Sequence, residues 1–239
     1  MHEFTPWPKT ARLFRDIVVT EKLDGTNSAI HITKGAAVLC PSSVFEAYPL
    51  KLGEVFVDGY IWFITAQSRK RIITPGKTTD NYGFAGWVHD NAADLVRILG
   101  EGLHFGEWWG RGIQRGYGLE GKRFSLFNTT RWDAVDEDSG TSMKSRAEQS
   151  DIIDQIDVVP TLYVGPFSES VVWQIVDDLR TYGSVAAPGF ENAEGVCIFH
   201  TASGRVFKVT SDHRDGNPQR LASGPLNDVR RDAGKWEAA

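Results

Sequence analysis

The stretch Thr20-Glu21-Lys22-Leu23-Asp24-Gly25-Thr26-Asn27 decides how the rest of the chain is interpreted. It follows a β-branched run at residues 16–19 that predicts a short buried strand, and an apolar alternation at 28–32 predicts a second strand after it. Lys22 is therefore expected at a strand end, beside polar groups of a tight turn that can orient its amine. Such a lysine acts as a covalent nucleophile where burial or neighbouring cations favour the neutral amine. The alternative is a plain hairpin turn, because Asp-Gly is the strongest short hairpin signal.

Composition is that of an ordinary globular protein. The chain has 239 residues, of which 41% are hydrophobic and 24% charged, enough for a sizeable core. No apolar run reaches the length of a membrane span, and the N-terminus lacks a signal-peptide pattern. Cys40 and Cys197 lie far apart and outside any metal-ligand spacing. These features predict a reduced, cytoplasmic protein without a membrane partner.

The net charge of −5 argues against a protein that coats nucleic acid indiscriminately. Positive charge nevertheless gathers in two segments, residues 69–77 and 111–131. A basic surface on an acidic protein indicates a site for a polyanion, and the alternative is a solvated face without function.

The remaining pattern predicts one α+β domain of mostly antiparallel sheets with flanking helices. Strands are expected at 60–66, 103–109 and 123–127, a helix at 81–99 that ends before Gly100, and a second helix capped by Ser168. We expect this domain to occupy residues 1–215, followed by a short C-terminal tail at 216–239.

A hairpin near the C-terminus joins residues 196–200 to 205–210. A three-residue joint with glycine last places Ile198 opposite Lys208. In that register, Glu194 and Lys208 project from the same face of the sheet. A carboxylate and a lysine on one face indicate a site, and a partly exposed structural ion pair is the alternative.

Six of these segments resemble, in order, the motifs of the covalent nucleotidyltransferases, which include ATP-dependent RNA and DNA ligases and messenger-RNA capping enzymes. They are Lys22-Leu-Asp24-Gly25-Thr-Asn27, Ser68-Arg69, Phe105-Gly106-Glu107-Trp108, Arg123-Phe124-Ser-Leu-Phe127, Glu194-Gly195-Val196-Cys-Ile198 and Val206-Phe207-Lys208-Val209. The resemblance covers about residues 15–210 and implies an ATP-grasp-like ligase adenylation domain. The Thr-Glu before Lys22 and the Thr-Asn after Gly25 are closest to the RNA ligases of the phage T4 RNA ligase 2 and RNA-editing branch.

The resemblance also implies roles for individual residues. Lys22 would attack ATP and carry AMP covalently, Lys208 would balance charge on the α-phosphate, and Glu194 would hold Mg²⁺ or Mn²⁺ through water. Asp24 belongs to the same catalytic motif as Lys22. Glu107 would contact a ribose hydroxyl, and Arg69 would contact ribose or a phosphate. Phe127 would stack on the adenine face, and Glu21 would lie near the adenine amino group. Asn27 would assist the leaving phosphate or the sealing step.

Two features depart from the family pattern. The fifth motif usually carries two lysines one residue apart, whereas Val206 and Thr210 flank Lys208 at that spacing. Either one phosphate contact is missing, or Arg205 supplies it. Only residues 209–239 follow Lys208, too few for the oligonucleotide-binding (OB-fold) barrel of DNA ligases and capping enzymes. That shortage leaves open whether a protein partner helps to grip the substrate.

The sequence thus favours an ATP-dependent RNA ligase that seals a 5′-phosphate end to a 3′-hydroxyl, in single strands or a nicked duplex, and a phage-like RNA-repair enzyme fits this size. Two alternatives remain: a small DNA or nick ligase with the same chemistry, and a nucleotide- or RNA-binding module with impaired catalysis.

Overall fold

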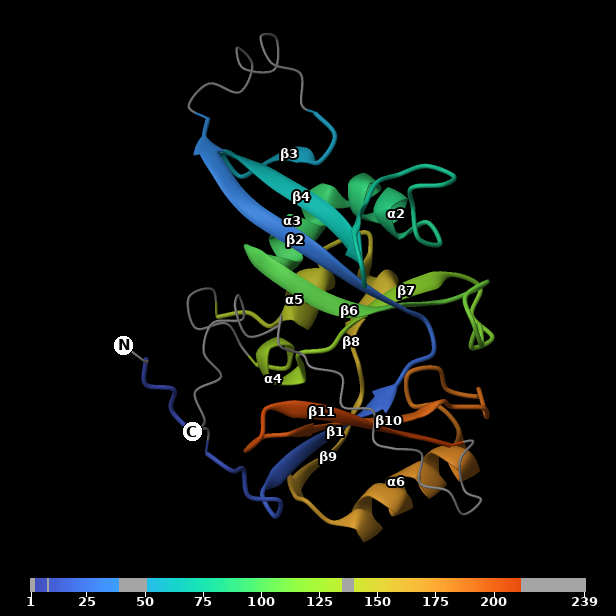
Figure 1. Cartoon of the computed structure of the whole chain (residues 1–239). Helices are drawn as coiled ribbons and strands as arrows, with labels where there is room; N and C mark the ends of the chain where they lie inside the picture. Colours follow the sequence, from blue (N-terminus) through green and yellow to red (C-terminus); the bar gives the residue numbers. More distant parts are fainter. Residues whose placement is uncertain (1–2, 8, 39–50, 135–139, 212–239) are drawn as a thin grey trace. The chain divides into compact units, whose positions relative to one another are not determined.

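The computed structural model describes residues 3–7, 9–38, 51–134 and 140–211 (Figure 1). The chain divides into two compact units. The first holds the described residues of Met1–Lys22 and Pro160–Leu226, and the second holds those of Leu23–Val159. The expected boundary after residue 215 and the tail at 216–239 lie outside the described residues, so that division stays a prediction.

The first unit is a four-stranded antiparallel sheet with one long helix on its face (Figure 1). Its strand order is β11-β10-β1-β9. Their bounds are β1 (Asp16–Lys22), β9 (Thr161–Pro166), β10 (Gly195–His200) and β11 (Arg205–Thr210). Helix α6 (Glu169–Tyr182) buries Val172, Val176 and Leu179 against Val19, Val196 and Ile198 of the sheet. One face of this sheet is therefore a core face, and the other is left for the candidate site.

The second unit is built on a seven-stranded sheet in the order β3-β4-β2-β6-β7-β8, with β5 paired to β4. Its strands are β2 (Thr26–Ala37), β3 (Glu54–Val57), β4 (Tyr60–Ser68), β5 (Ile72–Ile73), β6 (Gly102–Gly110), β7 (Lys122–Leu126) and β8 (Ile156–Val158). All neighbours are antiparallel except β7 and β8. Neither sheet closes on itself within the described residues, so the mixed α+β class with mostly antiparallel sheets is confirmed.

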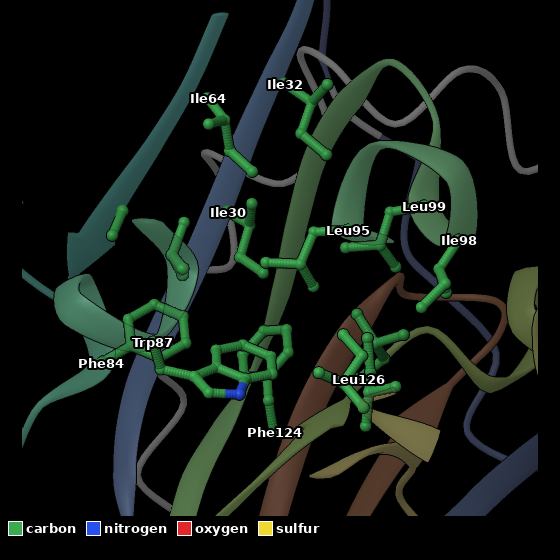
Figure 2. Packing of buried hydrophobic residues seen from close by; sticks show 14 of the residues in the cluster. Ile30, Ile32, Ile64, Phe84, Trp87, Leu95, Ile98, Leu99, Phe124 and Leu126 are labelled. Atoms are coloured by element: carbon green, nitrogen blue, oxygen red, sulfur yellow. The ribbon is translucent and has the colours of Figure 1, made fainter. Parts of the chain in front are cut away.

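Helices cover one face of the seven-stranded sheet. They are α2 (Phe84–Asp90), α3 (Ala92–Leu99), α4 (Thr129–Trp132), α5 (Met143–Ala147) and the 3-10 turn η1 (Ile153–Gln155). Figure 2 shows the core beneath them, where Phe84, Trp87 and Leu95 of the helices meet Ile30 and Phe124 of the sheet. In the described part of the chain, no helix combines the length and apolar character that crossing a membrane requires.

The single helix expected at 81–99 is wrong in one respect, because the segment forms two helices that break at Asn91. The φ and ψ angles of Asn91 are −113° and 21°, outside the helical region. Its side-chain Nδ2 donates to the carbonyl of Trp87 at 2.7 Å, a local bond that competes with the helical pattern. The expected end of the helical segment is confirmed, since Gly100 follows α3 with a left-handed φ of 68°.

The hairpin register is also wrong, by one residue. His200, not Thr201, pairs with Arg205, so the joint has four residues and Cys197 lies opposite Lys208. The reason is the turn, in which the backbone N–H groups of Ser203 and Gly204 both donate to the carbonyl of His200. Gly204 supplies the left-handed φ of 60° that this turn needs.

Candidate active site

Lys22 ends β1 and pairs with Gly195 at the start of β10. Its Nζ lies 2.5 Å from Oε2 of Glu194, and only 21% of the Lys22 side chain and 15% of the Glu194 side chain are exposed. Both residues belong to the first unit. The sequence-predicted nucleophile and the sequence-predicted metal ligand are therefore in direct contact.

Lys208 shares a sheet face with Lys22. Thr20 pairs with Cys197, and Cys197 pairs with Lys208, so these three side chains lie in one row. Because side chains alternate along a strand, Lys22 projects from the same face as Thr20, opposite to the face that packs on α6. Lys208 is exposed there. The sequence predicted Glu194 and Lys208 on one face from a register with Ile198 opposite Lys208. In the observed register Glu194 lies an odd number of residues from Cys197, the partner of Lys208, so strand alternation does not explain its position. Its contact with Lys22 is what brings it to the candidate site.

Arg205 cannot replace the second lysine of the fifth motif. It lies an odd number of residues from Lys208, so its side chain leaves β11 on the opposite face. Val206 and Thr210 are the neighbours of Lys208 on the open face. Within β11, Lys208 is the one cation that this face presents.

Glu21 points the other way from Lys22 and is 1% exposed. One carboxylate oxygen accepts from the hydroxyl of Ser184 at 2.6 Å, and the other accepts from the backbone N–H groups of Val185 and Ala186, each at 2.9 Å. Three hydrogen bonds satisfy this buried charge. Glu21 thereby connects β1, the strand that carries Lys22, to the segment after α6. Its expected place near adenine stays a prediction.

Asp24 opens the turn in the second unit and is held from two directions. Its backbone N–H donates to the phenol oxygen of Tyr117 at 2.8 Å. Its carboxylate accepts from Nε of Arg115 at 3.0 Å. Neither partner follows from motif spacing, although the glycines at 110, 112, 116, 118 and 121 indicate a loop in this segment.

Asn27 and Glu107 meet on neighbouring strands of the same sheet. Their Cα atoms are paired between β2 and β6, and Nδ2 of Asn27 donates to Oε2 of Glu107 at 2.8 Å. Glu107 is 7% exposed. The first and third motifs are therefore joined by a charge-assisted hydrogen bond.

Arg69 and Phe127 lie just past the ends of β4 and β7. Arg69 is exposed in the turn after Ser68. Phe127 is 39% exposed, and its backbone N–H donates to the carbonyl of Phe105. Each is therefore accessible to a ligand.

The two basic segments differ in what they offer a polyanion. The first carries Arg69, Lys70, Arg71 and Lys77, all exposed. In the second, Arg111 is exposed, whereas the Arg115 side chain is only 17% exposed and is paired with Asp24. Arg115 is therefore engaged within the fold, and the expectation that residues 111–131 contribute to a polyanion-binding surface stays a prediction.

The residues described include no group of three or more His, Cys, Asp or Glu side chains that would hold a metal ion by themselves. A cavity of about 170 Å³ between β3–β5 and the helices α2 and α3 is lined by other residues, among them Val55, Ile64 and Val88. None of the candidate site residues described above lines this cavity.

Comparison with known proteins identifies one family. The model of the family described as RNA ligase matches residues 15–210. No curated protein matches the chain. Solved structures that resemble it include the Naegleria gruberi RNA ligase, as a lysine-to-alanine mutant with ATP and Mn (16% identity, TM-score 0.44) and as the protein with PPi (16% identity, TM-score 0.43). The alignments cover 83% of this chain and 49% and 50% of those chains, so this chain spans about half their length.

Proposed function

The chain belongs to the RNA ligase family, and on this premise we propose that it is an ATP-dependent ligase that joins RNA ends through AMP carried on Lys22. The observation that supports this most directly is the position of Lys22, with Nζ 2.5 Å from Glu194 on the face that also bears Lys208. A nucleophile, a metal-binding carboxylate and a phosphate-binding cation are the three groups that nucleotidyl transfer needs.

The reaction comprises three displacements at phosphorus. First, Nζ of Lys22 bonds to the α-phosphorus of ATP, the α–β anhydride breaks, and pyrophosphate and a proton leave. Second, an oxygen of the RNA 5′-phosphate takes AMP, which breaks the P–N bond and frees the lysine. Third, the RNA 3′-hydroxyl attacks the 5′-phosphorus, so that a phosphodiester forms and AMP departs. Covalent capture thereby converts one difficult condensation into successive transfers.

Glu194 is the residue that we assign to a divalent ion, Mg²⁺ or Mn²⁺, through water. A single carboxylate suits Mg²⁺, which keeps much of its hydration and takes its remaining ligands from substrate phosphates. The ion would neutralise charge on the phosphates of ATP. The carboxylate itself lies against Nζ of Lys22 and so helps to orient the amine.

The remaining residues bind the nucleotide and the RNA. Glu107, oriented by Asn27, would accept from a ribose hydroxyl. Phe127 would stack on adenine with its exposed ring face, and Lys208 would stabilise the α-phosphate as a compact cation. Glu21 contributes indirectly, because its carboxylate already has three partners.

The RNA strand would meet the exposed basic segment Arg69–Lys77, whose positive charge recognises phosphates irrespective of sequence. Arg69 belongs to the second motif and would contact ribose or phosphate. The assignment to the phage T4 RNA ligase 2 and RNA-editing branch rests on the residues around Lys22, and a role in RNA repair rests on the size of the chain.

Sealing assays on matched substrates test the proposal. A nicked duplex is prepared with a 5′-phosphate and either a ribose or a deoxyribose at the 3′-hydroxyl end, and a single-stranded RNA serves as the third substrate. We expect ATP-dependent joining with the ribose end and much slower joining with the deoxyribose end. Equal joining of both ends would favour a DNA or nick ligase instead.

A further inference from the structure

The loop between β6 and β7, residues 111–121, reaches the turn that follows Lys22 in the chain. It supplies two side chains to the turn that follows Lys22. Tyr117 accepts a hydrogen bond of 2.8 Å from the backbone N–H of Asp24, and Arg115 donates one of 3.0 Å to the Asp24 carboxylate. In the sequence, Tyr117 lies 93 residues from Asp24 and Arg115 lies 91 residues from it.

The loop is built as a rigid support. Tyr117 is 2% exposed, and its ring stands edge-on against Trp109 with centroids 4.8 Å apart. Ile113 is fully buried. Backbone hydrogen bonds Ile113 to Gly110, Gly116 to Ile113 and Leu119 to Gly116 close three successive turns. The two hydrogen-bonding side chains therefore have little freedom to move away from the turn.

Two non-glycine residues of the loop hold left-handed backbone conformations. The φ angles are 44° at Gln114 and 53° at Tyr117. Such a conformation costs about 1 kcal/mol or more for each residue, and it persists only where the surrounding structure enforces it. Gln114 directly precedes Arg115, and Tyr117 is one of the two residues that hydrogen-bond to Asp24. Backbone strain of this kind is typical of functional segments.

The turn is also fixed from the side of β6. A Cβ atom on Gly25 would overlap the carbonyl oxygen of Trp108 and would lie 2.7 Å from Cβ of Trp109. The backbone of the turn is therefore in close contact with β6 on one side and is hydrogen-bonded to the loop through Asp24. The chain reaches Lys22 from this turn through one residue, Leu23, which is 4% exposed.

We propose that Arg115 and Tyr117 are positioning residues, which fix the Asp24–Gly25 turn of the motif that contains Lys22, without touching ATP or RNA. This inference rests on the proposed function of Lys22 as the nucleophile. Covalent transfer is sensitive to placement, since a displacement of about 1 Å of a reacting group can cost on the order of 100-fold in rate. Loosening the turn should therefore lower the rate of AMP transfer more than the affinity for ATP.

Two measurements on the full chain test the proposal. Amide hydrogen exchange at Asp24 reports the contact itself, and transfer of α-labelled AMP to the protein reports its consequence. Tyr117→Phe removes the accepting oxygen but keeps the ring, and Tyr182→Phe is its control because Tyr182 is 81% exposed on α6. Arg115→Gln and Asp24→Asn form a double-mutant cycle, with Arg97→Gln and Asp94→Asn as a control ion pair in α3.

We expect Tyr117→Phe to raise the exchange rate at Asp24 and to lower the AMP-transfer rate at saturating ATP, each by about tenfold, with half-saturation by ATP unchanged. In the cycle, the double variant should be no slower than the slower single variant. Arg115→Lys, which keeps the cation, should recover most of the rate lost in Arg115→Gln.

Faster exchange at Asp24 with an unchanged transfer rate would overturn the positioning role. A raised ATP half-saturation at an unchanged rate would overturn it as well, because the residues would then act on ATP binding. If Asp24 were protected from exchange but the unaltered protein took up no AMP, the proposed function of Lys22 would be the part that failed.

Discussion

Nζ of Lys22 lies 2.5 Å from a carboxylate oxygen of Glu194, although 171 residues lie between the two in the sequence. The pairing of β1 with β10 brings them together, because Lys22 is in register with Gly195. A carboxylate in that position serves two tasks in the proposed reaction: it orients the amine, and it binds the divalent ion that accompanies ATP.

Glu194→Gln should therefore lower AMP transfer to the protein by about 10- to 100-fold and raise the Mg²⁺ concentration needed for half-maximal rate. The amide keeps the size of the side chain but loses the charge that attracts both Lys22 and the ion. The measurement is the labelling rate as a function of Mg²⁺ and of Mn²⁺. Glu191→Gln, an exposed position in the same segment, is the control. An unchanged metal dependence in Glu194→Gln would contradict the assigned role.

The hydrogen bond between Asn27 and Glu107 should couple the first and third motifs energetically. We expect a coupling free energy of about 1 kcal/mol between Asn27→Ala and Glu107→Gln, because one partner is charged and buried whereas the other is exposed. Urea unfolding of the two single variants and the double variant measures this coupling. Strictly additive losses would mean that the 2.8 Å contact contributes nothing.

Gly25 should not tolerate a side chain. Gly25→Ala places a Cβ against the Trp108 carbonyl and the Trp109 side chain, so the turn or β6 must shift. Overpacking of this kind costs about 1–3 kcal/mol of unfolding free energy. Gly121→Ala is the matched control, since a Cβ there would meet nothing within 4 Å. Equal melting temperatures for the two variants would show that the close approach is not constraining.

His104 should make the fold sensitive to acid. Burial, with the nearby charge of Arg131 as a second cause, lowers the pKa of His104 to about 4 from the usual 6.5. The unfolded chain therefore binds a proton between these values that the folded chain does not, so stability is present above pH 6.5 and is lost as the pH falls towards 4. At pH 5 the loss amounts to about 2 kcal/mol.

Urea unfolding at pH 7.5 and pH 5 checks this expectation. His104→Gln can still donate to the Gly100 carbonyl that His104 Nε2 contacts at 3.0 Å, but it does not titrate. The variant should lose about 2 kcal/mol less than the original chain between the two pH values. A loss of equal size in both proteins would place the acid sensitivity elsewhere.

Much of the fold was predictable because short-range patterns determine it. The β-branched run before Lys22 and the alternation after it became β1 and β2, and the strands expected at 60–66, 103–109 and 123–127 became β4, β6 and β7. The family suggested by these segments is confirmed by the match over residues 15–210. The finer branch, near phage T4 RNA ligase 2, stays a prediction.

The features that were missed depend on backbone geometry that residue spacing does not encode. The hairpin register changed because the turn uses four residues and not three, which the Ala-Ser-Gly sequence alone does not decide. The contact between Asp24 and Arg115 required left-handed angles at Gln114 and Tyr117, which are rare for such residues. Motif spacing did not indicate the three partners of Glu21 either, since they lie in a segment more than 160 residues away. Its expected place near adenine stays a prediction.

The most direct test of the account is covalent labelling of the protein with α-labelled ATP and a divalent ion, followed by denaturing electrophoresis. Lys22→Ala is compared with the unaltered chain and with Lys144→Ala, an exposed lysine in α5. We expect an acid-labile labelled band in the unaltered chain and in Lys144→Ala, and none in Lys22→Ala. Absence of the band from the unaltered chain across Mg²⁺ and Mn²⁺ concentrations, or its persistence in Lys22→Ala, would contradict the assignment of Lys22 as the residue that carries AMP.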